Sequence, residues 1–66
     1  MKNFKIKAGN RYRDKIYGEI AYVRYFRKED GKVSIGYKNK SGEIIPYATI
    51  TELRFRRDYE PALGED

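Results

Sequence analysis

The sequence predicts an all-β fold, a small barrel of five short strands with one 3₁₀ turn before the last strand. Apolar residues alternate with polar ones at period two in several short stretches, as in strands with one buried face. Polar clusters that contain glycine separate these stretches. The length of 66 residues suits one domain with one small core. We expect residues 1–57 to form that domain and residues 58–66 to be an acidic, flexible C-terminal tail.

The first half of the chain predicts two strands. In residues 2–8, Phe4 and Ile6 alternate with lysines, and a Gly-Asn pair separates this stretch from residues 11–13, which continue it after a bulge. Residues 16–27 are rich in aromatic and β-branched residues. Apolar residues occupy both parities there, so this segment is either a strand buried on both faces or a bent strand that changes its inward face near Gly18.

Residues 32–38 give the clearest strand pattern. Val33, Ile35 and Tyr37 are predicted to face the core, and polar turns at residues 28–31 and 39–42 flank the strand. The alternate positions then form an outward face that is basic and nearly bare: Lys32, Ser34, Gly36 and Lys38. The small residues of this face would let the backbone of a partner come close.

The second half of the chain predicts a short strand, a turn and a last strand. Residues 44–47 predict a strand that Pro46 ends or confines to a sheet edge. Residues 48–53 predict one short helical or 3₁₀ turn, for which Thr49 is the candidate cap. Residues 53–57 predict the last strand, with Leu53 and Phe55 facing the core and Arg54 and Arg56 facing outward.

This order of elements resembles SH3-like small barrels. The opening of the KOW and Tudor-like branches of this fold is similar to Tyr12-Arg13 followed by the glycine and hydrophobic strand of residues 17–23. The closing part of such barrels is similar to residues 43–53. The resemblance covers residues 4–57. The acidic loop and tryptophan pair of proline-peptide-binding SH3 domains are absent, which argues against polyproline recognition. Small archaeal chromatin proteins share the size, the basic charge and the sheet-based design, which implies a general mode of DNA binding.

A second resemblance concerns the hairpin alone. Residues 30–37, 41–43 and Tyr47 are similar to the hairpin of the arm-binding domains of tyrosine integrases, which place a three-stranded sheet in the DNA major groove. Those domains need a C-terminal helix. Residues 58–66 are too short for it and contain Pro61 and Gly64, so this resemblance agrees less well with the chain.

The residue types present disfavour an enzyme. The chain has no histidine and no cysteine, so the commonest general base and the commonest transition-metal ligands are missing. No base accompanies Ser34 or Ser41, and the paired carboxylates lie in a turn or in the tail. We therefore expect no catalytic residue, no metal site and no cofactor. Without an apolar run long enough to cross a bilayer or a signal-peptide core, we expect a cytoplasmic protein that does not bind membranes.

The distribution of charge points to an anionic partner. Fifteen basic and six acidic residues give residues 1–57 a net charge of +9, while residues 58–66 hold −4. A basic body of this kind is typical of proteins that bind DNA or RNA through the phosphate backbone with little sequence specificity. An equally simple interpretation is that the charge keeps a small, tyrosine-rich chain in solution. The acidic tail is expected to compete for the basic surface.

The candidate contact residues are the basic side chains expected to point outward from the strands, together with one tyrosine. They are Lys5, Lys7, Arg11, Arg13, Arg24, Tyr25, Arg27, Lys32, Lys38, Arg54 and Arg56. Arginine offers bidentate donors to phosphate, and Tyr25, beside two arginines, is a candidate for stacking on a base. The alternative is a protein-interaction module, for example a small phage or mobile-element protein, that binds a host factor through an edge strand or a tyrosine-rich patch. The sequence leaves the oligomeric state open.

Overall fold

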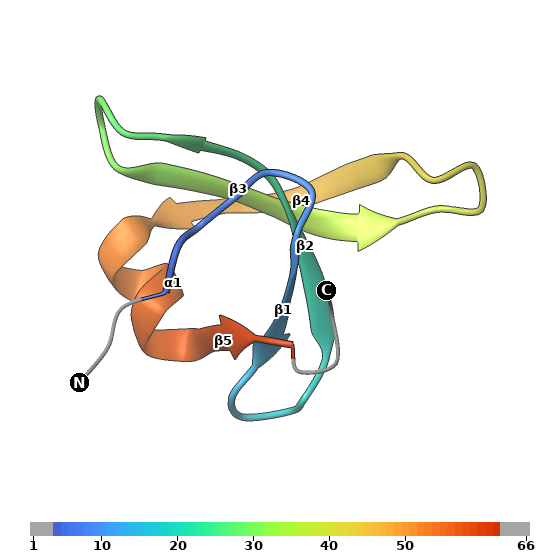
Figure 1. The fold of residues 1–66 in the computed structure, drawn as a ribbon, viewed down its shortest axis with the longest axis horizontal. Coiled ribbons are helices and arrows are strands. Elements are labelled where there is room, and N and C mark those ends of the chain that lie inside the picture. The colour runs from blue at the N-terminus through green and yellow to red at the C-terminus, as the bar shows by residue number, and fades with distance from the viewer. Residues whose placement is uncertain (1–3, 63–66) are drawn as a thin grey trace.

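The computed structural model describes residues 4–62 and contains one antiparallel sheet and one short helix (Figure 1). The elements follow one another as β1 (Arg11–Asp14), β2 (Ile20–Arg27), β3 (Lys32–Lys38), β4 (Ile44–Thr51), α1 (Glu52–Asp58) and β5 (Tyr59–Pro61). The order across the sheet is β4-β3-β2-β1-β5, so β4 and β5 lie at its two edges. The mostly-β character predicted from the sequence is therefore confirmed. The element before the last strand is an α-helix and not a 3₁₀ turn, and residues 48–51, where that turn was predicted, continue β4.

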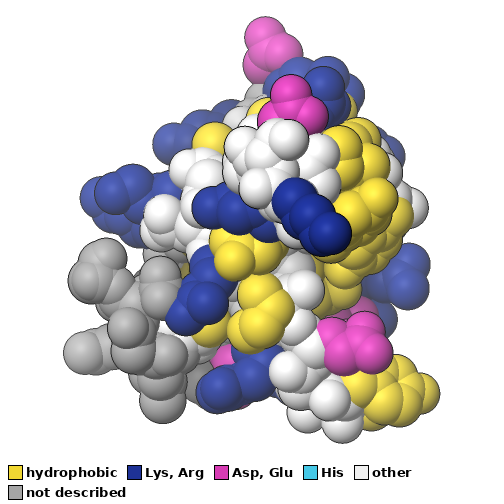
Figure 2. Space-filling model, turned by 90° about the vertical axis from the view of Figure 1, so that its right-hand side faces the viewer, with side chains coloured by type: hydrophobic (Ala, Val, Ile, Leu, Met, Phe, Trp, Pro, Cys, Tyr) yellow, Lys and Arg dark blue, Asp and Glu magenta, His cyan; other side chains and the backbone are white. Residues whose placement is uncertain are grey.

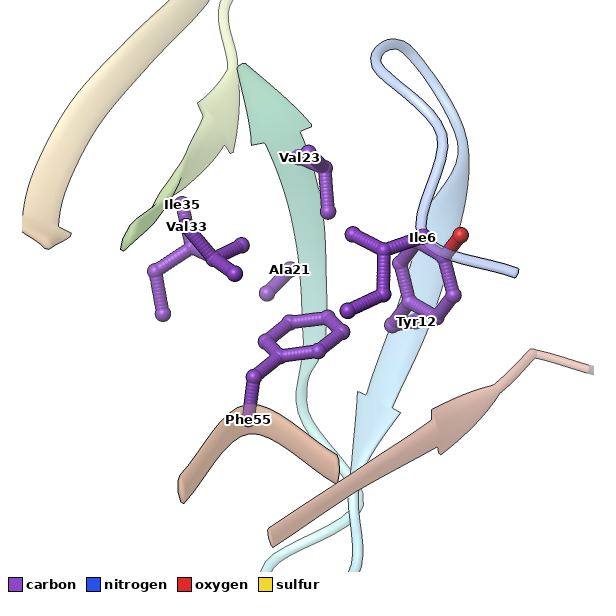
Figure 3. Close-up of a cluster of buried hydrophobic side chains, with 7 residues drawn as sticks. All are labelled: Ile6, Tyr12, Ala21, Val23, Val33, Ile35 and Phe55. Atoms are coloured by element: carbon purple, nitrogen blue, oxygen red, sulfur yellow. The ribbon is translucent and has the colours of Figure 1, made fainter. Parts of the chain in front are cut away.

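The core lies on one side of this strongly bent sheet. Figure 3 shows the side chains of β1, β2 and β3 converging on Phe55 of α1. Phe55 is fully buried and packs edge to face on Tyr12, with ring centroids 5.1 Å apart. Val33 and Ile35 are buried as predicted, but Tyr37, the next-to-last residue of β3, is 52% exposed.

The strand β2 bends at Arg24. Ala21 and Val23 face the core, the register then shifts between Val23 and Tyr25, and Phe26 faces the core after the shift. A β-bulge of this kind inserts one residue and changes which parity points inward. Of the two interpretations of residues 16–27, the bent strand is therefore correct, with the bend at Arg24 and with Gly18 in the preceding turn.

The predicted first strand is confirmed for its second piece, residues 11–13, which lie in β1, and is wrong for the described part of its first piece. Residues 4–8 lie outside the sheet, although Ile6 is buried and Lys5 and Lys7 are exposed as the alternation predicts. This segment is joined to β1 by the hydroxyl of Tyr12 and not by a ladder of backbone hydrogen bonds. The hydroxyl donates to the carbonyl of Lys5 at 2.8 Å and accepts from the amide of Lys7 at 3.0 Å. Residues 2–3 of that prediction lie outside the described residues.

The predicted last strand is also wrong, because residues 52–58 form α1. Thr51 caps the helix by accepting a hydrogen bond from the amide of Arg54, so the cap is Thr51 and not Thr49. The last strand is β5, which pairs with β1 and brings Arg13 opposite Glu60. Residues 59–61, expected in the flexible tail, thus belong to the sheet; residues 63–66 lie outside the described residues.

The strands β3 and β4 approach each other unusually closely near the start of β4. The pairing register shifts between Ile35 and Gly36, and Gly36 lies opposite Pro46. The backbone of Ile45 occupies the space that a side chain at Gly36 would need. Pro46 lies on an edge strand, as its missing amide proton predicts.

Candidate nucleic-acid interface

The side of the sheet that faces away from the core is basic. Cross-strand partners point to the same side of a sheet, and the register pairs Arg11 with Tyr22 and Arg27 with Lys32 on the side opposite the buried residues. We call this surface the outer face. Its basic and tyrosine residues, with Arg24 at the bulge, are Arg11, Arg13, Tyr22, Arg24, Tyr25, Arg27, Lys32 and Lys38. Figure 2 shows the side of the molecule that carries the β3–β4 turn, where Lys and Arg side chains lie among hydrophobic ones.

Two tyrosines of β2 make cation–π contacts with neighbouring basic side chains. The guanidinium carbons of Arg24 and Arg27 lie 5.7 and 5.4 Å from the centroid of the Tyr25 ring. Lys38 of β3 places its Nζ 4.7 Å from the centroid of Tyr22. Such contacts hold a cation near an aromatic surface without neutralising it. The outer face therefore offers half-buried rings and adjacent positive charges together.

Few carboxylates oppose these charges. The only acidic side chain that the register of the described strands places on the outer face is Glu60, which pairs with Arg13 at 2.9 Å. At the β2–β3 turn Asp30 pairs with Arg27, also at 2.9 Å, and that hydrogen bond lowers the pKa of Asp30. Within residues 4–62, no ion pair involves Arg24, Lys32 or Lys38.

The helix arginines of the predicted site lie elsewhere. Phe55 packs α1 on the core side of the sheet, opposite the outer face. Arg56 pairs with Glu52 at 2.9 Å, donates to the carbonyl of Phe4 and lies over its ring, so its role is to attach the N-terminal segment. Arg54 pairs with Asp58 at 3.6 Å. The two arginines expected beside Lys32 and Lys38 therefore do not join them.

The small residues of β3 also differ from the expectation. Ser34 is 2% exposed and Gly36 is buried, so neither offers an open approach to a partner. Ser34 lies between Tyr25 and Thr49 on the two neighbouring strands, and Gly36 lies between Tyr22 and Pro46. The backbone of Ile45 in β4 fills the space beside Gly36, so a partner has no access to it.

Lys5 and Lys7 lie outside the sheet and share a cleft with Arg11. Together with Phe4, Asn10 and Pro61 they line a cleft of about 330 Å³, which we call the N-terminal cleft. A second cleft of about 250 Å³ lies between β4, α1 and the β1–β2 turn, and Ile16, Tyr47 and Ile50 contribute to it. Its charged residues are Asp14, Arg54 and Asp58.

Sequence reasoning missed the contact between Tyr22 and Lys38. The parity of residues 16–27 placed Tyr22 with Phe26, whereas the bulge at Arg24 puts them on opposite sides. The change of apolar parity after Val23 is the signal that could have located this bulge.

The described residues contain no group of three or more His, Cys, Asp or Glu side chains placed to hold a metal ion. None of the helical segments within residues 4–62 has the length and apolar character of a membrane span. Comparison with known proteins gave no match to a family model, a curated protein or a solved structure.

Proposed function

We propose that this chain is a small nucleic-acid-binding module that docks the outer face on the phosphate backbone of DNA or RNA. The observation that carries the proposal is the arrangement on β2 and β3, where Tyr25 contacts Arg24 and Arg27 and Tyr22 contacts Lys38. Guanidinium and ammonium groups bind phosphate oxygens, and tyrosine rings stack on bases of any sequence. Rings and charges alternate over a few strand positions, which suits a backbone with regularly spaced phosphates.

The proposed binding depends on charge more than on sequence. Contacts to phosphate release counterions from the nucleic acid, so the logarithm of affinity falls linearly with the logarithm of salt concentration. Arg24, Lys32 and Lys38 contribute most in this proposal, because each remains available for phosphate while Arg13 and Arg27 are shared with carboxylates. Their contacts to phosphate carry no base information, so little sequence specificity is expected.

The fold proposed for this module is an SH3-like small barrel. The strand order β4-β3-β2-β1-β5 supports this assignment, as does the position of a short helix between β4 and β5 in the chain. In such a barrel the bent β2 serves both halves of the sheet, and the bulge at Arg24 supplies the bend.

The experiment that tests the function is a binding titration at several salt concentrations. Fluorescein-labelled oligonucleotides, single-stranded and duplex, are titrated with wild-type protein and with the variant R24Q/K38Q, and anisotropy is measured. The wild type is expected to bind at low salt with a linear log–log salt dependence, and the variant is expected to have a slope smaller in magnitude by about 1–2. The control K15Q/K28Q removes the same charge from two turns. No binding by the wild type at low salt would refute the proposal.

A second candidate function, binding of a protein partner, is supported by β4. This eight-residue edge strand carries no charged residue in a chain that is 38% charged. Edge strands are the usual sites at which a partner adds a strand. Tyr47, 56% exposed, and Ile16, 74% exposed, both line the second cleft beside this edge.

Salt separates the two candidates. A partner strand added to β4 would bind through backbone hydrogen bonds and apolar contacts, so its affinity would change little between low and moderate salt. The substitution Thr49→Pro would block strand addition on β4 without altering any charge of the outer face. Loss of oligonucleotide binding in this variant, with the fold intact, would favour the β4 edge over the outer face.

A further inference from the structure

The N-terminal cleft differs from the second cleft in charge. Among residues 4–62 it is lined by three cations, Lys5, Lys7 and Arg11, and by no acidic residue. The second cleft combines one cation, Arg54, with the carboxylates of two aspartates. An anion is therefore favoured in the first cleft and repelled by most of the charge in the second.

The walls of the N-terminal cleft are held in place by buried contacts. Tyr12, 1% exposed, bonds through its hydroxyl to the backbone of Lys5 and Lys7, two of the residues that line the cleft. The ring of Phe4 packs on Tyr12 with centroids 5.5 Å apart. The backbone that carries the two lysines is thus fixed to β1 before any ligand binds, which reduces the entropy lost on binding.

The size of the cleft limits its ligand. A volume of about 330 Å³ is at the lower end of the range for small-molecule sites, roughly 300–1,000 Å³. Such a space admits one nucleotide but not a stacked base pair. The aromatic and apolar surfaces of Phe4 and Pro61 suit a base or sugar, and Lys5 and Lys7 suit its phosphate.

Arg11 belongs both to the lining of the cleft and to the outer face. Arg11 lines the cleft and also lies directly opposite Tyr22 on the neighbouring strand, and Tyr22 in turn contacts Lys38. The strand position of Arg11 thus connects the cleft with Tyr22 and Lys38.

We propose that the N-terminal cleft binds one unstacked nucleotide of a strand whose neighbouring phosphates lie on the outer face, so that the protein prefers single-stranded nucleic acid to duplex. This inference rests on the proposed function and adds the class of nucleic acid. A duplex can contact the outer face but cannot place one nucleotide in the cleft unless that nucleotide leaves the stack, which costs about a few kcal/mol.

The test compares two double variants of equal charge. K5Q/K7Q removes two cations of the cleft, and K15Q/K28Q removes two cations from turns outside it. Each protein is titrated with a labelled oligothymidylate of about twelve nucleotides and with a duplex of the same length at about 50 mM salt. Thermal unfolding is measured in parallel, and no change is expected because the hydrogen bonds of Tyr12 use the backbone of Lys5 and Lys7.

The expected result is a wild-type affinity about tenfold higher for the oligothymidylate than for the duplex. K5Q/K7Q should lose most of this preference, while K15Q/K28Q should weaken both ligands equally and retain it. If the wild type binds both ligands equally, or if the two double variants behave alike, the cleft is not a nucleotide site, although the function of the outer face stands. If the wild type binds neither ligand, the proposed function fails and the cleft assignment fails with it.

Discussion

Gly36 of β3 lies so close to Ile45 of β4 that a β-carbon at Gly36 would be 2.1 Å from the Ile45 carbonyl oxygen. The obstructing atoms belong to backbone, so they cannot rotate away. We expect Gly36→Ala to separate the two strands and to lower the free energy of unfolding by about 2–3 kcal/mol. Gly42→Ala is the control, because Gly42 has a φ of +86° but open space around it, and it should cost only about 1 kcal/mol. Urea unfolding measures both, and an equal loss would contradict the close approach.

The hydroxyl of Tyr12 joins the N-terminal segment to β1 through two hydrogen bonds. Tyr12→Phe keeps the buried ring and removes both bonds, so we expect a loss of about 1–2 kcal/mol in the free energy of unfolding. Tyr37→Phe is the matched control, since the side chain of Tyr37 is 52% exposed, and its effect should stay within about 0.5 kcal/mol. Similar effects of the two substitutions in urea unfolding would show that the Tyr12 hydroxyl does not hold the segment.

The helix α1 offers a pair of substitutions that tests its orientation. Phe55 is fully buried and Leu53 is 81% exposed, although the two lie only two positions apart. Phe55→Ala should lower the free energy of unfolding by about 3–5 kcal/mol, whereas Leu53→Ala should change it by less than about 0.5 kcal/mol. If residues 53–57 formed a strand with both side chains in the core, the two substitutions would be similarly harmful. Thermal unfolding followed by circular dichroism distinguishes these results.

Tyr59 makes stability depend on pH in the alkaline range. Burial, with a contribution from Tyr47 and two nearby aspartates, raises the pKa of Tyr59 to about 12. In the unfolded chain the pKa is about 10, so between these values the unfolded state releases a proton that the folded state keeps. Stability from this group is complete below pH 10 and decreases as pH rises toward 12. Between pH 10 and pH 12, the midpoint temperature of thermal unfolding should fall less steeply with pH for Tyr59→Phe than for the wild type. Equal slopes for the two proteins would contradict the shifted pKa.

The extent to which the sequence predicts this fold depends on how far local pattern agrees with tertiary packing. Residues 32–38 form β3 with Val33 and Ile35 inside, because a central strand with strict alternation has one stable register. Residues 53–57 also alternate, yet they form a helix. The ion pairs of Glu52 with Arg56 and of Arg54 with Asp58 have helical spacing and oppose the strand pattern.

The candidate site was predictable where it follows strand parity and was not predictable where it depends on long-range contacts. Lys32 points away from the core because Val33, its neighbour in β3, is buried. Lys38 lies an even number of positions further along β3 and therefore on the same side. The contact of Lys38 with Tyr22 depends on a bulge in another strand. The N-terminal cleft depends on the hydrogen bonds of Tyr12 to a segment outside the sheet, a feature that alternation of residues cannot indicate.

The most direct measurement of the central claim is an NMR titration of the isotope-labelled protein with a single-stranded oligonucleotide at low salt. The account predicts that amide shifts concentrate at the outer face and at the N-terminal cleft, around Arg11, Tyr22, Arg24 and Lys38, while the amides of β4 and α1 change little. Shifts that concentrate on β4 and the second cleft, or no shifts at all, would contradict it.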